Sequence, residues 1–455
     1  MHPTIGWMHF LLPNEIIGLV KLKEVIMDQS IIKCFDNIFG YEGTKNELYI
    51  LASALKSSNK CKELGIRIPK GVIFYGDPGL GKTTMALDLI AATERYSVIY
   101  RKENGLKFAT SIKEAFLQAK QNQPSIILLD DMDKFSNADS SHRNTDEYVI
   151  LQTCIDKVKN DDVVVVATAN EMYYFPHSLL RAGRFDRHIN IQSPSVREAA
   201  IILKEYLKNA KVEDDIDTES IARLMNGRSC AELETIINEA GIYAIARNKK
   251  LIDMDCMVDA CLTIFYHAPD MPDDILSSNT KQVAIHEAGH AVAHELLLPN
   301  STALVSTRIS STMKQGITVF DNSEYTFMSN YSKKLLMCCL AGGAAHEINF
   351  CETDPGAASD IEHAVSIASS MICSLAYNGI KKIDSRAIYE SEHTKAQIDS
   401  EVNFVINKAY LEVKQLLMKN RYIVEKVADA LTERKTLLGK DVRQIIASCQ
   451  SSNEI

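Results

Sequence analysis

The sequence predicts an α/β domain built on a parallel sheet, followed by a mainly α-helical domain. In the first half, three short apolar runs have the pattern of buried strands, at residues 72–75, 125–130 and 163–169, with helical stretches between them. Strands that alternate with helices favour a parallel sheet with helices on its faces. In the second half, long stretches such as residues 395–418 repeat apolar residues at helical spacing. The chain of 455 residues is also too long for a single core.

Composition and charge exclude several classes of protein. A hydrophobic content of 46% and a charged content of 24% are typical of a soluble globular protein. The net charge of -9 argues against a nucleic-acid binder. The 11 cysteines include no Cys-x-x-Cys pair, which favours free thiols in a reducing compartment, and we expect the cytoplasm. The apolar run at residues 5–12 ends at Pro13 and is too short for a membrane span, so no span is expected.

The first apolar run leads into a glycine-rich loop and then into a helical stretch at residues 85–93. Backbone N–H groups of such a loop surround phosphate oxygens, a lysine neutralises the β- and γ-phosphates, and a hydroxyl ligates Mg²⁺. A tight turn without any ligand is the alternative, but the order of strand, loop and helix disfavours it. The predicted nucleotide-binding residues are Gly76, Asp77, Pro78, Gly79, Leu80, Gly81, Lys82, Thr83 and Thr84.

Polar residues at the ends of the other two apolar runs complete such a site. Asp130 and Asp131 close the second run, where a nucleotide site needs one acid for Mg²⁺ and one to orient the attacking water. Asn170 follows the third run and could contact the γ-phosphate or the water. Arg184 and Arg187 could simply be solvated surface residues. Behind a nucleotide-binding core, however, their spacing suggests charge donors to the γ-phosphate of a neighbouring subunit.

A His-Glu-x-x-His pattern marks a second site about two hundred residues further on. His286 and His290 are four residues apart and share a helix face, so both can ligate Zn²⁺ while Glu287 reaches a bound water. A metal lowers the pKa of that water, and the glutamate can accept its proton as a peptide bond is attacked. A chance match is the alternative, but the surrounding Ala- and Leu-rich stretch, which Pro299 ends, supports a helix.

Spacing alone leaves the third metal ligand open. Asp321, Glu324 and Glu347 are all possible acids. His294 is expected to be a helix-surface residue rather than a ligand, because position 296, where a longer metal-binding pattern would need histidine, is Leu296.

Several motifs in a fixed order resemble the FtsH family of AAA+ ATP-dependent zinc metalloproteases. The resemblance covers about residues 34–448. Besides the glycine-rich loop, the metal-binding stretch and the pair Asn170 and Arg184, it includes the segments at residues 34–40, 62–71, 227–233 and 238–246.

The resemblance has consequences for ligands and assembly. It implies that Asp360, in the segment at residues 354–364, completes the zinc site, and that Glu347 occupies an acidic position near it, where a structural carboxylate is equally consistent. It also implies one Zn²⁺ per chain, ATP and Mg²⁺ as cofactors, polypeptide substrates, and a ring that we expect to be a homo-hexamer.

Three features depart from the family pattern. Asp131 stands where the family has glutamate, and its shorter side chain predicts slow hydrolysis. Between residues 98 and 110 the family's substrate-gripping loop is altered. Tyr100 or Phe108 could replace its aromatic residue, and each could equally be a core residue. The family usually has a transmembrane region before its ATPase, where this sequence has about 33 residues. Their amphipathic stretch at 15–26 is expected to pack on the protein.

These observations predict six parts and one preferred function. The parts are a short N-terminal segment (1–34), an α/β AAA+ nucleotide domain (35–193), a helical lid (194–268), a linker (269–277), a mainly α-helical zinc metallopeptidase domain (278–448) and a disordered tail (449–455). The preferred function is ATP-driven unfolding and degradation of polypeptides, in which Glu287, Asp131, Arg184 and Arg187 are catalytic. One alternative is an ATP-independent endopeptidase with the ATPase ring as scaffold. Another is a remodelling ATPase with an inactive peptidase fold, which the intact zinc-site residues disfavour.

Overall fold

The computed structural model describes residues 28–102, 108–135, 146–173, 175–269, 280–310, 315–325, 330–373 and 392–452. The predicted amphipathic stretch at 15–26 and nearly all of the predicted linker therefore lie outside the described residues. The chain divides into two compact units. The first runs to Pro194 and includes Gly227–Glu232, and the second comprises Ser195–Asn226 and the chain from Leu233 onward.

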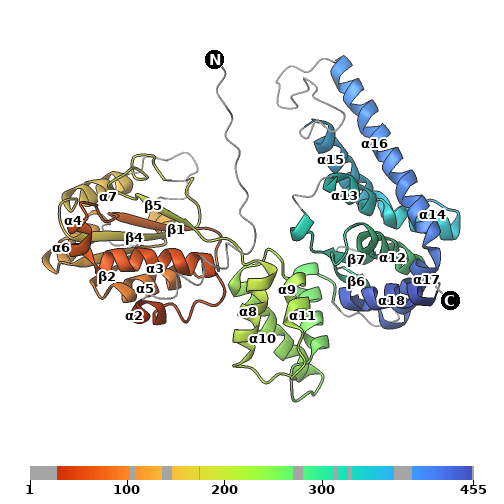
Figure 1. The fold of residues 1–455 in the computed structure, drawn as a ribbon, viewed down its shortest axis with the longest axis horizontal. Helices are drawn as coiled ribbons and strands as arrows, with labels where there is room; N and C mark the ends of the chain where they lie inside the picture. The colour runs from red at the N-terminus through yellow and green to blue at the C-terminus, as the bar shows by residue number, and fades with distance from the viewer. Residues whose placement is uncertain are drawn as a thin grey trace, which may run out of the picture. The chain divides into compact units, whose positions relative to one another are not determined.

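The first unit is built on a five-stranded parallel sheet with strand order β2-β3-β4-β1-β5. Figure 1 shows helices on both sides of this sheet. The strands are β1 (Gly71–Tyr75), β2 (Tyr96–Arg101), β3 (Ser125–Asp130), β4 (Val163–Ala169) and β5 (Arg187–Asn190). The helices are α2 (Gln29–Lys33), α3 (Glu42–Lys56), α4 (Ser58–Glu63), α5 (Lys82–Thr93), α6 (Phe108–Gln121), η1 (Met132–Phe135) and α7 (Asp146–Lys157).

The strand register brings the predicted nucleotide-binding residues to one edge of the sheet. In β1 and β4, Tyr75 is paired with Ala169, and in β3 and β4, Leu129 is paired with Ala167. Because parallel strands end at the same edge, the segments that follow β1, β3 and β4 meet there. Strands β1, β3 and β4 are apolar along nearly their whole length because both of their faces are buried.

Tyr100 and Phe108 are core residues in this structure. Both are 8% exposed, and their rings make edge-to-face contacts with each other and with Phe135. The Tyr100 hydroxyl is 2.9 Å from the Ser111 hydroxyl. Their burial supports the core alternative over a substrate-gripping role, while residues 103–107 lie outside the described part of the chain.

The second unit begins with four helices, α8 (Val196–Leu207), α9 (Thr218–Leu224), α10 (Cys230–Ala246) and α11 (Met254–Tyr266), of which α10 starts in the first unit. Ser195 caps α8 reciprocally with Glu198, since the serine hydroxyl accepts from the Glu198 N–H and the glutamate accepts from the Ser195 N–H. Such a cap starts a helix directly after Pro194. The predicted α/β domain followed by a group of helices agrees with this arrangement.

The rest of the second unit is mainly α-helical, as predicted. Its helices are α12 (Thr280–Leu297), η3 (Ser323–Tyr325), α13 (Tyr331–Cys339), α14 (Ala341–Phe350), η4 (Pro355–Ala357), α15 (Ala358–Cys373), α16 (Glu392–Lys419), α17 (Arg421–Arg434) and α18 (Gly439–Ser452). The predicted disordered tail is wrong for residues 449–452, because α18 continues to Ser452 and Cys449 is buried in its core-facing side.

A small antiparallel sheet, for which the sequence carries no clear strand pattern, lies against the helices. Its order is β7-β6-β8, formed by β6 (Thr302–Ile309), β7 (Gln315–Phe320) and β8 (Thr436–Leu438). Strand β7 is at the edge of this sheet and contacts α12.

Helix α12 is the central helix of this region and packs closely on α14. A Cβ atom at Gly289 of α12 would lie 2.4 Å from the Ala345 Cβ and 2.7 Å from the Ala341 carbonyl oxygen. The small residues on both helices therefore allow a close approach of the two backbones. Within the described ranges, no helix has the combined length and apolar character needed to cross a membrane.

Candidate functional site

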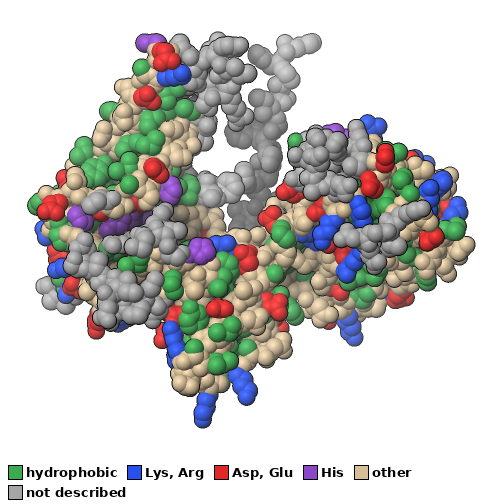
Figure 2. Space-filling view, turned by 180° about the vertical axis from the view of Figure 1, so that it is seen from behind, with side chains coloured by type: hydrophobic (Ala, Val, Ile, Leu, Met, Phe, Trp, Pro, Cys, Tyr) green, Lys and Arg blue, Asp and Glu red, His purple; other side chains and the backbone are tan. Residues whose placement is uncertain are grey.

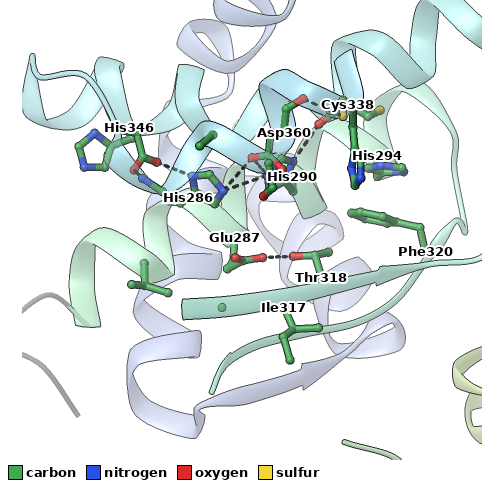
Figure 3. A pocket seen from close by; sticks show the side chains of 18 of the residues that line it. His286, Glu287, His290, His294, Ile317, Thr318, Phe320, Cys338, His346 and Asp360 are labelled. Atoms are coloured by element: carbon green, nitrogen blue, oxygen red, sulfur yellow. Dashed lines mark hydrogen bonds and ion pairs between the residues drawn. The ribbon is translucent and has the colours of Figure 1, made fainter. Parts of the chain in front are cut away.

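Three side chains on two helices converge on one point in the second unit, as Figure 3 shows. His286 and His290 project from one face of α12, and Asp360 projects from the first turn of α15. The Asp360 carboxylate is 3.2 Å from Nε2 of His286 and 3.1 Å from Nε2 of His290, and the two Nε2 atoms are 3.1 Å apart. Within the described ranges, this trio is a group that could hold a metal ion, since its ligand atoms lie within 4.8 Å of one another.

The outer nitrogens of the two rings have partners that orient them. Nδ1 of His290 is 2.9 Å from the Cys338 carbonyl oxygen, which can only accept a hydrogen bond, so this Nδ1 is the protonated nitrogen. Nδ1 of His286 is 2.5 Å from the Asp354 carboxylate. In each ring Nε2 is then the nitrogen that faces a metal, which it can bind once it has lost its proton. Two imidazoles with one carboxylate form a donor set that suits Zn²⁺. The residues present therefore fit the metal.

Charge in the site also favours a cation. Burial lowers the pKa of His286, but hydrogen bonds to Asp354 and Asp360 outweigh it and raise this pKa to about 10. Burial raises the pKa of Asp360, whereas hydrogen bonds from His286 and His290 hold it well below its usual range. The two carboxylates thus stabilise positive charge at the position where the three donor atoms meet.

Glu287 lies beside the trio and is 5% exposed. Its carboxylate accepts a hydrogen bond from the Thr318 hydroxyl of β7, and burial raises its pKa (Figure 3). Gly316 of β7 lies directly against this carboxylate, since a Cβ there would be 2.1 Å from Oε1 of Glu287. The edge strand β7 therefore holds the proposed proton acceptor in place.

A cavity of about 950 Å³ opens beside these residues. Its wall combines the polar residues of the trio with apolar side chains, among them Val283, Ile317, Phe320, Leu335 and Ile367. Figure 2 shows several histidine side chains close together on the surface of the second unit. A cavity of this size, lined by both polar and apolar side chains, suits a polypeptide side chain or a small ligand.

The expectation that His294 is a surface residue is wrong. His294 is 2% exposed, its ring stacks on Phe320 with centroids 3.3 Å apart, and Nδ1 is 3.1 Å from the Ser301 hydroxyl. The reason is that α12 is enclosed on nearly all sides, so even a polar position on it is buried.

The other possible acids make structural contacts. Asp321 accepts hydrogen bonds from Arg223 and Asn226. Glu347 accepts from the Tyr410 hydroxyl and pairs with Lys414. The side chain of Glu324 lies outside the described residues. Sequence reasoning missed the role of Asp354, which orients the His286 ring. Its place in the same short segment as Asp360 could have suggested that it lies near the site.

The first unit contains the predicted nucleotide loop between β1 and α5. The Lys82 ammonium donates to the carbonyl oxygens of Gly76 and Asp77, both at 2.7 Å, and to Oδ1 of Asn170 at 3.0 Å. Loop carbonyls and an amide therefore hold the lysine where a phosphate would replace some of these contacts. Leu80 is 1% exposed and anchors the loop in the core. Lys82 is also buried, while the other residues of the loop and Thr84 are accessible.

Asp130 is placed as a magnesium-site acid would be. It is 3% exposed and accepts hydrogen bonds from the hydroxyls of Thr83 at 2.8 Å and Thr168 at 2.7 Å. Arg101 donates to its second oxygen at 2.6 Å. Burial raises the pKa of Asp130, but these hydrogen bonds hold it below its usual value, so the carboxylate is charged. The residues present fit a nucleotide with Mg²⁺.

The arginines and Asp131 have partners within their own unit. Arg184 forms two hydrogen bonds to Asp156, at 3.0 and 2.7 Å. Arg187 is 3.7 Å from Glu47. Asp131 forms an ion pair with Lys134 at 2.6 Å.

Comparisons with known proteins match the nucleotide domain, the lid and the peptidase domain. Residues 72–193 match the ATPase family associated with various cellular activities (AAA), residues 215–259 match the AAA+ lid domain, and residues 274–445 match peptidase family M41. The chain is 26% identical over 450 residues to ATP-dependent zinc metalloprotease FtsH 2 of Thermoanaerobacter sp. (strain X514), covering 96% of this chain and 87% of the relative. It is 31% identical to FtsH 2 of Phytoplasma mali (strain AT), covering 90% and 62%. It is 30% identical to FtsH 3 of Symbiobacterium thermophilum, covering 90% and 71%.

Proposed function

Because this chain belongs to the FtsH family of ATP-dependent zinc metalloproteases, we propose that it couples ATP hydrolysis to the unfolding and degradation of polypeptides. The chain is a protease with ATPase activity, and its cofactors are Zn²⁺, ATP and Mg²⁺. The proposal adds the mechanical coupling and the residues that perform each step.

We assign the zinc ligands to His286, His290 and Asp360, with one Zn²⁺ per chain. The observation that carries this assignment is the convergence of their ligand atoms within 4.8 Å, beside a buried glutamate. When bound, zinc would polarise the scissile carbonyl and acidify a water.

In this proposal Glu287 performs the proton transfers of peptide hydrolysis. Its pKa is raised by burial, which brings a carboxylate closer to the range in which it can accept and return a proton at neutral pH. The Thr318 hydroxyl orients the carboxylate, and Asp354 orients the His286 ring.

In the ATPase half, residues 76–84 would surround the phosphates, with Lys82 neutralising their charge. Thr83 and Asp130, which already share a hydrogen bond, would hold Mg²⁺. Asn170 would contact the γ-phosphate or the water.

The assembly we propose is a homo-hexameric ring, the arrangement typical of the family. Arg184 and Arg187 would then act on the nucleotide of the neighbouring subunit. To do so, Arg184 must give up its hydrogen bonds to Asp156 and bind the γ-phosphate instead. A cytoplasmic location, polypeptide substrates and the absence of a nucleic-acid partner remain predictions of the sequence.

One observation favours a second candidate function, an endopeptidase whose ATPase ring is only a scaffold. Asp131, predicted to orient the attacking water, is bonded to Lys134 and has a shorter side chain than the family's glutamate. A weak ATPase would leave the zinc site to cleave unfolded chains without ATP.

The test compares a tightly folded substrate with an unfolded peptide, each with ATP, with a non-hydrolysable analogue and with no nucleotide. We expect the folded substrate to be degraded only with ATP. Glu287→Gln should keep about one Zn²⁺ per chain and lose cleavage of both substrates. Cleavage of the unfolded peptide at an equal rate in all conditions, with the folded substrate untouched, would favour the scaffold instead.

A further inference from the structure

We propose that Asp133, and not Asp131, is the carboxylate that orients the attacking water during ATP hydrolysis. The inference rests on the ATPase half of the proposed function and replaces the assignment made from sequence. Both residues follow β3, which ends at Asp130, but the turn between them sends their side chains to different places.

Asp131 is turned toward the protein surface. Its backbone has a positive φ of 54°, a conformation that non-glycine residues adopt infrequently, and the 3₁₀ helix η1 begins at the next residue. Its carboxylate pairs with Lys134 at 2.6 Å, and the two side chains are 43% and 68% exposed. To reach the nucleotide, Asp131 would have to leave this partner and also span the gap left by the missing methylene group.

Asp133 instead contacts the residues that surround the phosphate position. Its carboxylate accepts a hydrogen bond from Nδ2 of Asn170 at 2.8 Å, and Oδ1 of the same amide accepts from the Lys82 ammonium at 3.0 Å. Asp133, Asn170 and Lys82 thus form a continuous hydrogen-bonded row. The carboxylate is separated by one amide from the amine that neutralises the β- and γ-phosphates.

Charge is consistent with this placement. Burial lowers the pKa of Lys82, and among the acids that oppose this effect Asp133 is the strongest, ahead of Asp131. The carboxylate of Asp133 therefore acts more strongly on the Lys82 ammonium than the carboxylate of Asp131 does.

The row suggests how the water would be used. A water beside the γ-phosphate would donate one hydrogen bond to Asp133, whose position is maintained by Asn170. As the water oxygen forms its bond to the γ-phosphorus, the bond from that phosphorus to the bridging oxygen breaks, and ADP leaves with the electron pair. The water's proton passes to Asp133 and then to the released phosphate, so the carboxylate is regenerated.

Two matched substitutions, Asp133→Asn and Asp131→Asn, test the proposal. Each removes one carboxylate without changing side-chain size, and an asparagine at 133 keeps an oxygen that can accept from Asn170. The measurements are binding of a fluorescent ATP analogue with Mg²⁺, steady-state ATPase rate, and chromatographic identification of the nucleotide that stays on the protein after one incubation with ATP.

We expect Asp133→Asn to bind the analogue within about threefold of the unchanged protein, to lose ATPase kcat by about 100-fold or more, and to retain ATP. Asp131→Asn should keep kcat within about threefold and retain ADP. Asp131→Glu, which restores the family residue, should then raise kcat only slightly.

The opposite pattern, with Asp131→Asn inactive and Asp133→Asn active, would overturn the proposal. So would a loss of activity in both variants, or a loss of analogue binding in Asp133→Asn, which would indicate a structural role. Failure of the ATPase half of the proposed function looks different, since the unchanged protein would then hydrolyse no ATP. Cleavage of an unfolded peptide reports the zinc site independently in every variant.

Discussion

Gly342→Ala is expected to destroy the zinc site while leaving the protein folded. Gly342 lies in α14 beneath the two imidazoles, and a Cβ atom there would be 2.4 Å from Nε2 of His290 and 2.5 Å from Nε2 of His286. These are the two nitrogens proposed to bind the metal. The neighbouring Gly343 is the matched control, because its Cβ would meet the Ala357 Cβ at 3.5 Å, an ordinary contact.

The magnitude follows from these distances. An uncharged contact between carbon and nitrogen is comfortable only at roughly 3.4 Å, so the rings must move by about 1 Å to admit the methyl group. Metal–ligand distances tolerate only about 0.2 Å, and a displacement near 1 Å at a reacting centre can lower the rate about 100-fold. Against this, glycine to alanine in a helix interior gains up to about 1 kcal/mol of helix stability, so neither variant should unfold through helix propensity.

The assay measures zinc per chain by elemental analysis, cleavage of an unfolded peptide, and helix content by circular dichroism. Gly342→Ala should retain little zinc and lose at least about 100-fold in peptide cleavage, with unchanged helix content. Gly343→Ala should match the unchanged protein in all three. If Gly342→Ala keeps one zinc per chain and the original cleavage rate, the proposed ligand geometry is refuted.

Three further predictions concern the neighbourhood of Glu287, the ring and acid stability. Gly316→Ala combines a positive φ of 81° with a Cβ 2.1 Å from the Glu287 carboxylate, so we expect zinc to be retained and cleavage kcat to fall by about tenfold or more; unchanged kcat would contradict the role of β7. Mixing Arg184→Ala chains with Lys82→Ala chains should restore part of the ATPase activity, and light scattering that finds only monomers with ATP would refute a shared site. Burial holds the pKa of His294 well below its usual value of 6.5, so the folded protein keeps it neutral while the unfolded chain binds a proton below that pH. The unfolding free energy should therefore fall as pH drops below about 6.5, by at most about 1.4 kcal/mol per pH unit from this group, and His294→Gln should flatten that slope in urea titrations at pH 5 to 7.

Features determined within one element were predictable from sequence. The strand at residues 163–169 is a continuous apolar run, which is the sequence pattern of a strand buried on both faces. His286 and His290 share a face of α12 because four residues make about one helical turn. The edge at which Asp130 and Asn170 meet follows from parallel pairing alone.

Features that depend on segments distant in the chain could not be predicted from the sequence. Strand β8 pairs with β6 across more than a hundred residues, and its three residues carry no strand pattern of their own. The positive φ of Asp131, which follows Asp130 at the end of β3, likewise has no signal in the sequence. In our proposal, the turn at this residue leaves Asp133 rather than Asp131 on the nucleotide side.

The partners of the zinc site show which weaker signal the sequence did contain. Each imidazole needs an acceptor at Nδ1, and these come from the carbonyl of Cys338 at the end of α13 and from Asp354 before α15. Both segments flank α14, whose residues Ala341–Ala345 are all alanine or glycine. Because these side chains are so small, α14 can lie directly against the face of α12 that carries the two imidazoles. This close packing brings the segments before and after α14 within hydrogen-bonding distance of the rings. Five consecutive small residues downstream of a His-Glu-x-x-His pattern therefore predict the helix that packs on the metal-binding helix. The hydrogen-bond acceptors for the two Nδ1 atoms should be sought immediately before and after it.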